Sequence, residues 1–150
     1  MRAVIQRVSQ ASVTIDGEIV SSIKTGLLIL LGIGEDDDSS DVTWLVGKIC
    51  RMRLFADSDD KMNLSLADIN GDAIVVSQFT LQALTKKGNR PSFIRAAKPE
   101  ISEPLYDAFC ETIQTELGKP IGRGRFGADM KVALVNDGPV TIVIDTKSRE

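Results

Sequence analysis

The side chains best suited to take part in a reaction follow a run of apolar residues, in the segment Ser77-Gln78-Phe79-Thr80. They combine two hydroxyl groups and an amide with an aromatic ring. A hydroxyl group attacks at neutral pH only when a base takes its proton, and histidine most often serves as that base. The sequence contains no histidine. A nucleophilic mechanism would therefore need a lysine, a carboxylate or a group of the substrate.

The two cysteines, Cys50 and Cys110, do not replace the missing histidine. Both lie beside apolar residues in stretches with a helical pattern, which is typical of buried and unreactive thiols. Two cysteines without histidine also fall short of the ligand set of a structural zinc site. We therefore expect no metal and no cofactor. The low cysteine content fits a reducing compartment, and we expect a cytoplasmic protein.

Basic residues gather in two loops, although the net charge of the chain is −3. Residues 85–98 carry lysines and arginines and no acidic residue, and a second cluster spans residues 119–125. A small positive patch on an acidic protein suits the end of a nucleic acid better than a long duplex. A solvated face with two aromatic anchors is the alternative. The candidate RNA contacts are Lys86, Lys87, Arg90, Phe93, Arg123, Arg125 and Phe126, the two phenylalanines as rings on which bases stack.

Glycines 122, 124 and 127 have the spacing of a dinucleotide-binding loop. That spacing has meaning only between a strand and the start of a helix. Here the glycines follow a predicted helix and precede a predicted strand, so the pattern argues against a nucleotide cofactor.

The segment Asn136-Asp137-Gly138-Pro139 separates two alternating stretches and would ordinarily be a turn. Glycine leaves the backbone bare, whereas proline fixes φ and removes a hydrogen-bond donor. The pair Gly138-Pro139 therefore exposes a stiff carbonyl group with no side chain in front of it.

Strands and two helices must position these residues. Alternating or continuous apolar patterns predict strands, with a hairpin turn at Asp16-Gly17. A helix is predicted from a cap at Ser39 or Ser40 to about Met52, and a second from a cap at Ser102 to Gly118. The predicted strands are residues 1–8, 12–15, 18–23, 26–33, 73–81, 130–135 and 140–145, with a short one at 54–55; residues 82–98 are predicted to be a long loop.

These elements predict one domain over residues 1–150 of mixed α/β (α+β) class. Several hairpins favour largely antiparallel sheets with the two main helices packed on one side. The first eight residues do not have the pattern of a signal peptide. The longest apolar run, residues 27–31, is too short to cross a membrane.

Four segments occur together in a specific order and spacing: Gln6-Arg7-Val8, Ser77-Gln78-Phe79-Thr80-Leu81, Arg90-Pro91-Ser92-Phe93 and Asn136-Asp137-Gly138-Pro139-Val140-Thr141. Each is weak alone. As a set, over residues 1 to about 145, they make the sequence similar to the D-aminoacyl-tRNA deacylase (D-tyrosyl-tRNA deacylase) family of bacteria and eukaryotes.

The resemblance implies a proofreading hydrolase that cleaves the ester between a D-amino acid, or mischarged glycine, and the 3′ end of tRNA. It implies a homodimer with its active sites at the subunit interface. Gly138 and Pro139, joined by a cis bond, would enter the partner's pocket and reject L-amino acids. Ser77, Gln78, Phe79 and Thr80 would form the catalytic pocket, with Thr80 either the nucleophile or only a positioning group; the lack of a nearby base favours positioning.

Three other functions fit parts of the sequence. A non-catalytic RNA-end binding module would bind tRNA without releasing the amino acid. A small-molecule acyl hydrolase would cleave simple esters, but the basic loops disfavour it. A dimeric structural protein would leave the long loop and the Gly138-Pro139 pair unexplained.

Overall fold

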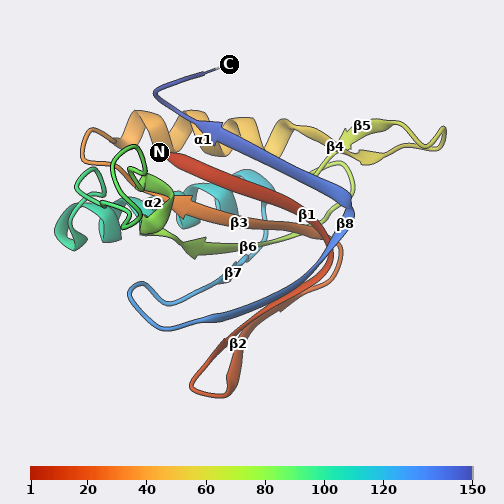
Figure 1. The fold of residues 1–150 in the computed structure, drawn as a ribbon. Helices are drawn as coiled ribbons and strands as arrows, with labels where there is room; N and C mark the ends of the chain where they lie inside the picture. Colours follow the sequence, from red (N-terminus) through yellow and green to blue (C-terminus); the bar gives the residue numbers. More distant parts are fainter. Residues whose placement is uncertain (150) are drawn as a thin grey trace.

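The computed structural model describes residues 1–149, in which two helices pack over one face of a strongly curved sheet (Figure 1). This architecture confirms the predicted mixed α/β class. The elements are β1 (Arg2–Ile15), β2 (Glu18–Ile23), β3 (Gly26–Gly32), α1 (Ser39–Arg51), β4 (Arg53–Ala56), β5 (Met62–Ser65), β6 (Asp72–Ser77), the 3₁₀ helix η1 (Phe79–Gln82), α2 (Pro99–Leu117), β7 (Gly122–Arg123) and β8 (Lys131–Asp145).

The main sheet has the order β2-β1-β3-β6-β7, and β8 pairs with the other side of β1. The pairs β3–β6 and β6–β7 are parallel, whereas β1 is antiparallel to β2, β3 and β8. A separate two-stranded sheet, β4–β5, projects beyond the end of α1 (Figure 1). The prediction of a largely antiparallel arrangement holds for the first half of the chain and for β8.

Strand β1 is one element rather than the two that the pattern predicted. Its first half pairs with β3 and its second half with β2, while β8 follows it along the other side. Ser9 and Gln10 are exposed at the change of partner, yet Gln10 still pairs with Val135. Polar residues within an alternating pattern thus mark a bend in this strand and not its end.

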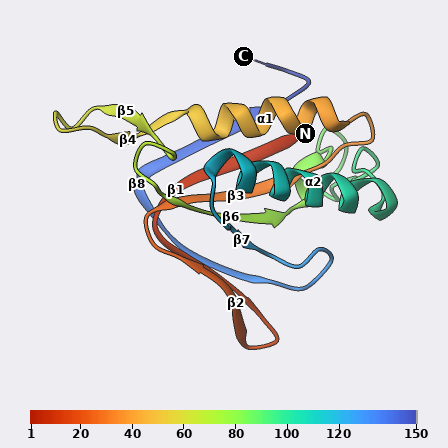
Figure 2. The ribbon, with the colours of Figure 1, turned by 180° about the vertical axis from the view of Figure 1, so that it is seen from behind.

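The sheet has a hydrophobic core on each face. Ile5, Ile29 and Val75 pack with the inner faces of α1 and α2, which lie over the same face of the sheet (Figure 2). Leu28, Ile74 and Val76 point the other way, into a second core that the curled β1–β2–β8 portion encloses. Because successive side chains of a strand face opposite sides, burial of both faces explains the uninterrupted apolar run in β3.

Both helices begin at residues other than those predicted. Asp38 caps α1: its carboxylate accepts hydrogen bonds from the backbone N–H groups of Ser40 and Asp41, and Asp41 in turn accepts from the backbone of Asp38. A carboxylate both accepts these bonds and matches the positive end of the helix, so it displaces the serines.

The second helix starts at Pro99 because proline fits the first turn, where its missing N–H is not needed. Ser102 is therefore inside α2 and donates a hydrogen bond to the carbonyl of Lys98. Gly118, with φ 65°, ends the helix as predicted. Neither helix in the described part of the chain is long and apolar enough to cross a membrane.

Two further differences concern strands near the predicted site. The strand expected over residues 73–81 ends at Ser77, and Phe79–Gln82 form η1 instead. Strand β5 was not predicted: Met62–Ser65 alternate apolar and polar residues over only four positions, and they pair only with β4. The early end of β6 turns Phe79 and Thr80 outward from the sheet, where both are exposed.

The two-core arrangement makes a stability prediction. Leu28→Ala and Ile29→Ala should each lower the free energy of unfolding by about 2–5 kcal/mol, because each truncation leaves a cavity in a different closed core. Chemical denaturation measures both. Ile19→Ala, at a strand position that is 67% exposed, is the control and should cost less than about 0.5 kcal/mol. An equally small cost for Leu28→Ala would mean that the second core is not closed.

Candidate active site

A cavity of about 300 Å³ opens where β6 ends. Its wall on one side is the strand end with Ser77, Gln78 and Phe79. The loop that carries Phe126 and Met130, together with Val132 at the beginning of β8, closes the other side. The structure therefore brings three of the four predicted catalytic residues to one cavity, together with an aromatic residue predicted to contact RNA.

Thr80, the fourth predicted residue, lies beside this cavity on η1. The side-chain amide of Gln78 donates a hydrogen bond of 2.5 Å to the Thr80 hydroxyl oxygen. Among the described residues this amide is the only side-chain partner found for the hydroxyl, and an amide cannot take its proton. The geometry thus orients the Thr80 hydroxyl without activating it as a nucleophile.

The first turn of η1 also presents backbone donors. The N–H of Gln78 binds the carbonyl of Leu31 at 2.8 Å, and that of Leu81 binds the carbonyl of Gln78 at 3.2 Å. The N–H groups of Phe79 and Thr80, between them, belong to the first turn of a 3₁₀ helix, whose donors have no acceptor within the helix. They lie next to the cavity and are suited to bind an oxyanion.

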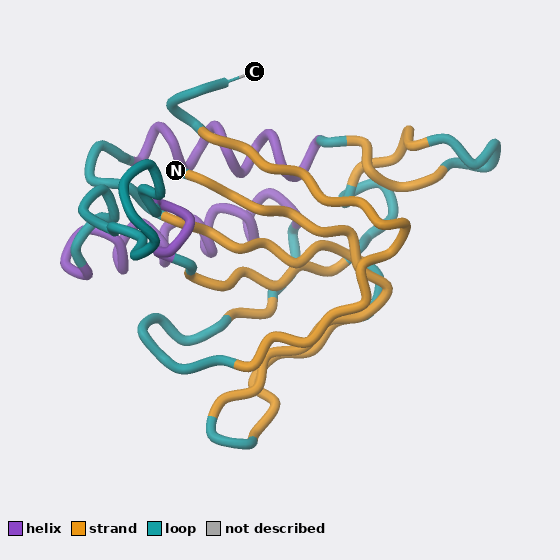
Figure 3. Tube along the Cα trace, viewed as in Figure 1, coloured by secondary structure: helices purple, strands orange, loops and turns teal. Residues whose placement is uncertain are grey.

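The first basic loop folds back onto η1. Leu84 and Ser92 exchange two backbone hydrogen bonds, which close residues 85–91 into an exposed tip carrying Lys86, Lys87 and Arg90. Phe93 then meets Phe79 edge to face, with ring centroids 5.1 Å apart. Loops and η1 gather at this end of the sheet (Figure 3). Phe79 lines the cavity and contacts Phe93, so it connects the cavity to the positive loop.

The second basic loop contributes less charge than predicted. Arg123 lies 3.6 Å from the carboxylate of Asp107 on α2, and its backbone is held by the hydroxyl of Ser21. Arg125 is exposed. Phe126 lines the cavity, and Tyr106 packs behind it with ring centroids 6.0 Å apart. The loop therefore supplies an aromatic wall, and Arg123 serves first as a partner for α2.

Tyr106 is a residue that the sequence did not single out. Its hydroxyl is buried and donates a hydrogen bond of 2.9 Å to the carbonyl of Val75, which also accepts from the N–H of Gly124. Burial raises the pKa of this hydroxyl far above its usual value. Tyr106 thus joins β6 to the loop of Phe126. An apolar helical stripe gives no signal of such a role.

Both thiols are buried, as predicted. Burial raises the pKa of Cys50 and of Cys110 to about 11, so both remain protonated at neutral pH. Neither borders the cavity at the end of β6.

Gly138 and Pro139 do not form a turn between two strands. Gln6 pairs with Thr141 and Val8 with Asn136, so residues 137–140 bulge out opposite Arg7 within the single strand β8. The Gly138–Pro139 bond is cis, and both residues are exposed. The strand continues through the segment because β1 pairs with both of its ends.

Arg7 and Asn136 hold this bulge. The Arg7 guanidinium donates to the carbonyls of Asp137, at 3.0 Å, and of Leu54, at 2.6 Å. The side chain of Asn136 accepts from the N–H of Val140 and donates to the hydroxyl of Thr141. A Cβ atom on Gly138, where φ is 131°, would lie 2.9 Å from both Arg7 and Val140. Only glycine suits this position.

Within one chain the bulge lies far from the cavity. Arg7 aligns with Leu27 and Ala73, whereas Ser77 aligns with Leu31 and Ala3, four residues away along the strands. Three strand spacings also separate β8 from β6. At about 3.4 Å per residue and about 4.8 Å per strand, the separation is roughly 20 Å. The structure does not bring Gly138 and Pro139 to the other predicted site residues.

A sequence model of the family described as D-Tyr-tRNA(Tyr) deacylase matches residues 4–145 of the chain. A D-aminoacyl-tRNA deacylase of Flavobacterium psychrophilum is 63% identical over 150 residues and one of Bacteroides thetaiotaomicron is 59% identical, each alignment covering the whole of both chains. These matches confirm the resemblance drawn from the four sequence segments.

Two solved structures are also similar. One, described as a c-Myc DNA unwinding element binding protein, has a TM-score of 0.90 and 42% identity over 97% of this chain and 98% of its own. The other, described as a probable eukaryotic D-amino acid tRNA deacylase, has a TM-score of 0.81 over 95% of this chain and 97% of its own; at 18% identity it supports the fold alone. From a family match over almost its entire length and relatives near 60% identity, the chain belongs to the D-aminoacyl-tRNA deacylase family.

Proposed function

We propose that this chain, an ester hydrolase of the D-aminoacyl-tRNA deacylase family, proofreads charged tRNA in the cytoplasm. It would hydrolyse the ester between a D-amino acid, or wrongly attached glycine, and the 3′ end of tRNA. The observation that carries the proposal is the cavity at the end of β6, where Ser77, Gln78 and Phe79 meet Phe126 beside a basic loop. That cavity has an aromatic wall for a base and polar groups for an aminoacyl ester.

The aminoacyl group and the terminal adenosine would share this cavity. Phe79, which is 57% exposed, Phe93 and Phe126 offer ring faces or edges to an unpaired base. Lys86, Lys87 and Arg90 stand on the exposed tip next to these rings and would attract the phosphates of the tRNA end, with Arg125 on the second loop. We assign Arg123 a smaller role in binding the tRNA phosphates, because its guanidinium already pairs with Asp107.

Hydrolysis here would use the substrate's own reactivity. Water adds to the ester carbonyl carbon, the bond to the ribose oxygen breaks, and that oxygen leaves with a proton as a hydroxyl. The adjacent ribose hydroxyl assists the attack, so no histidine is needed. The N–H groups of Phe79 and Thr80 would stabilise the oxyanion, each contributing about 3 kcal/mol to the transition state. The Thr80 hydroxyl, held by Gln78, would position the substrate and the backbone.

The site would select D-aminoacyl esters by excluding the side chains of L-amino acids. The carbonyl at Gly138 carries no side chain in front of it. The guanidinium of Arg7 holds the preceding carbonyl, that of Asp137, so the backbone at Gly138 would not swing away from a colliding group. An L side chain would meet this wall, whereas a D side chain would point elsewhere. Glycine has no side chain to collide and would pass. A rigid main-chain wall thus explains why such an enzyme would also act on glycyl-tRNA.

The wall must come from a second copy of the chain, because it lies roughly 20 Å from the cavity of its own subunit. Strand β8 offers a surface for such a partner. In the described residues it pairs with β1 on one side only, and it exposes Val135 and Val143. An open edge with exposed apolar side chains is a typical interface. We therefore infer a homodimer in which each subunit completes the other's site.

The wild-type protein should release D-tyrosine from D-tyrosyl-tRNA and glycine from glycyl-tRNA, and leave L-tyrosyl-tRNA intact, because only the L side chain meets the wall. Deacylation of the three radiolabelled substrates at equal concentration measures this. Equal rates for the two tyrosyl esters would remove the proposed selection. Binding without any release would favour an RNA-end binding module.

Thr80→Val should keep a substantial rate, within about tenfold of wild type, because a positioning hydroxyl contributes about the energy of one hydrogen bond. Single-turnover deacylation of D-tyrosyl-tRNA is the measurement. A fall toward the uncatalysed rate would assign Thr80 as the nucleophile. Thr85→Val, in the exposed part of the loop, is the matched control and should leave the rate unchanged.

Gly138→Ala should reduce the ratio of D-ester to L-ester hydrolysis, because the added methyl group would displace the backbone from Arg7 and Val140. The ratio of the two deacylation rates measures this loss. Gly88→Ala adds a methyl group at another glycine with positive φ, where no atom lies within 4 Å, and should keep selectivity. Sedimentation equilibrium of the wild type should give the mass of two chains; a monomer with full selectivity would contradict the shared site.

A further inference from the structure

The 3₁₀ helix η1, whose N–H groups are proposed to bind the oxyanion, is a single short turn. Two backbone hydrogen bonds close it: the N–H of Leu81 donates to the carbonyl of Gln78 at 3.2 Å, and the N–H of Ala83 donates to the carbonyl of Thr80 at 3.1 Å. Helices of this type stay short because their hydrogen-bond geometry is poor. The position of η1 must therefore be set by contacts with the rest of the chain.

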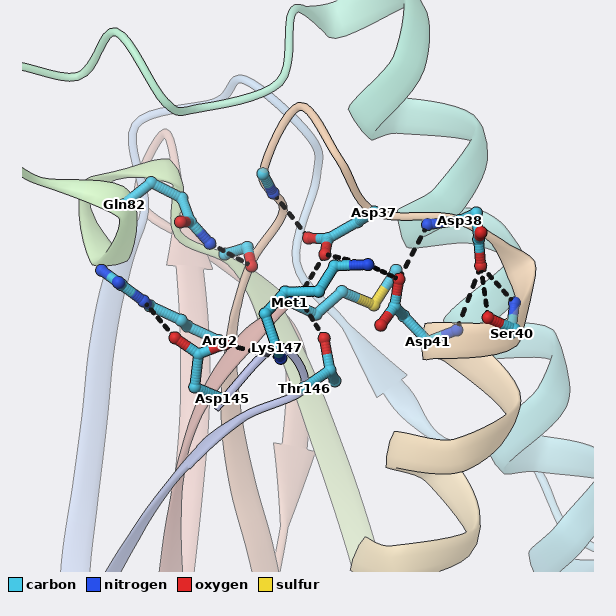
Figure 4. Close-up of polar contacts among 12 residues, drawn as sticks. Met1, Arg2, Asp37, Asp38, Ser40, Asp41, Gln82, Asp145, Thr146 and Lys147 are labelled. Atoms are coloured by element: carbon cyan, nitrogen blue, oxygen red, sulfur yellow. Dashed lines mark hydrogen bonds and ion pairs between the residues drawn. The ribbon is translucent and has the colours of Figure 1, made fainter. Parts of the chain in front are cut away.

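Strand β3 supports η1 from below. The N–H of Gln78 donates to the carbonyl of Leu31 at 2.8 Å, and the buried side chain of Gln82 donates to the carbonyl of Gly32 at 3.0 Å (Figure 4). Gly32 also permits a close approach, because a Cβ atom there would lie 2.8 Å from both the carbonyl oxygen of Gln78 and the Cβ atom of Leu81. The lack of a side chain at Gly32 thus lets η1 lie directly on the end of β3.

Arg2 holds the last turn of η1 from the side of β1. Its Nη1–H donates to the carbonyl of Leu81 at 3.0 Å, and its Nε–H donates to the carboxylate of Asp145 at 2.9 Å (Figure 4). The last carbonyl groups of a helix have no acceptor role within the helix, so they need partners from outside it. The guanidinium of Arg2 is such a partner, and it joins η1 to the end of β8.

Arg2, Gly32 and Asp145 form one row across three adjacent strands. Arg2 of β1 is aligned with Gly32 of β3 on one side and with Asp145 of β8 on the other. One residue further along β3, Leu31 is aligned with Ser77 at the end of β6. The planar guanidinium group binds its two acceptors in fixed relative directions, which a flexible ammonium group would not do. The row is therefore a rigid base for η1, close to Ser77.

We propose that Arg2 is a positioning residue for the hydrolysis. By binding the carbonyl of Leu81 it would hold η1 so that the N–H groups of Phe79 and Thr80 stay in place beside the cavity. Arg2 does not line the cavity at the end of β6, so it acts through η1 and not on the substrate. The inference rests on the proposed function, which assigns the oxyanion donors to η1. Donors of this kind lose much of their effect when their placement changes.

Arg2→Ala should lower kcat for D-tyrosyl-tRNA about tenfold and leave KM nearly unchanged, because groups that act in the transition state are misplaced while the aromatic rings and the basic loop remain. The melting temperature should fall by only about 2–4 °C, as expected for the loss of a partly exposed ion pair. Arg51→Ala is the matched control, since Arg51 of α1 pairs with Glu116 of α2 at 3.0 Å. It should keep the wild-type kcat.

Free guanidinium ions should raise the kcat of Arg2→Ala about threefold, because the ion can bind the same two acceptors but must lose its freedom of motion to do so. The site is accessible, since the Arg2 side chain is 34% exposed. The assay adds up to about 100 mM guanidinium chloride, well below the molar range that unfolds most domains. Sodium chloride at the same concentration is the control, because salt weakens contacts with tRNA phosphates. A purely structural role would give no such gain.

Gly32→Ala provides an independent arm, which also serves if Arg2→Ala does not fold. The added methyl group would lie 2.8 Å from the carbonyl oxygen of Gln78, so η1 must move away from β3. The kcat should again fall about tenfold, and guanidinium should not restore it. Gly34→Ala is the matched control, because the nearest atoms to its methyl group would lie at an ordinary 3.5 Å. It should keep the wild-type kcat.

An unchanged kcat for Arg2→Ala, or a loss of kcat that guanidinium leaves as it is, would overturn the role of Arg2. An unchanged kcat for Gly32→Ala would overturn the dependence of catalysis on the position of η1. Either result leaves the proposed function intact, because the wild-type chain is assayed in parallel. If the wild-type chain released no D-tyrosine, the proposed function itself would fail.

Discussion

Pairing of β8 with β1 along almost the whole of both strands, with register shifts on either side of Val8, is the constraint on which the other features depend. The ladder is fixed on either side of residues 137–140, so the extra residues have no choice but to bulge outward. Arg7, opposite the bulge, binds its backbone and that of Leu54. Among the described residues the same ladder leaves the other edge of β8 open, so one strand both displays the Gly138 carbonyl and has the edge that would face the second subunit of the proposed dimer.

Because the sequence contains no histidine, the proposed mechanism depends less on proton transfer by a side chain and more on the positioning of the ester and the attacking water. An aminoacyl ester is reactive enough that a fixed water, a ribose hydroxyl and two backbone N–H groups suffice for the mechanism proposed. Rigid placement then matters more than basicity. The structure supplies it by buried contacts behind the cavity: Tyr106 joins Val75 to the loop of Phe126, and Gln78 is anchored to Leu31. These supports carry no charge that must change during the reaction.

The sequence allowed the fold class, most strands and the four-residue segment of the cavity to be predicted, because alternation and turn residues are local signals. It could not place Phe126 beside Ser77, since that contact joins segments about fifty residues apart. The serines at the start of α1 were predicted as caps. Asp38 is the cap instead, because its negative carboxylate also interacts favourably with the positive end of the helix dipole. The bulge at Gly138 could not be predicted either. A turn and a bulge contain the same residue types, and only the pairing of β1 with both flanking segments distinguishes them.

In the proposed mechanism main-chain groups perform the decisive tasks: a carbonyl at Gly138 selects the substrate, and N–H groups of η1 stabilise the transition state. Main-chain atoms have few ways to move once their strands are paired, so they make good walls and anchors. Side-chain substitution cannot remove them. A variant therefore affects them only by changing the residues that surround them, as at Arg7.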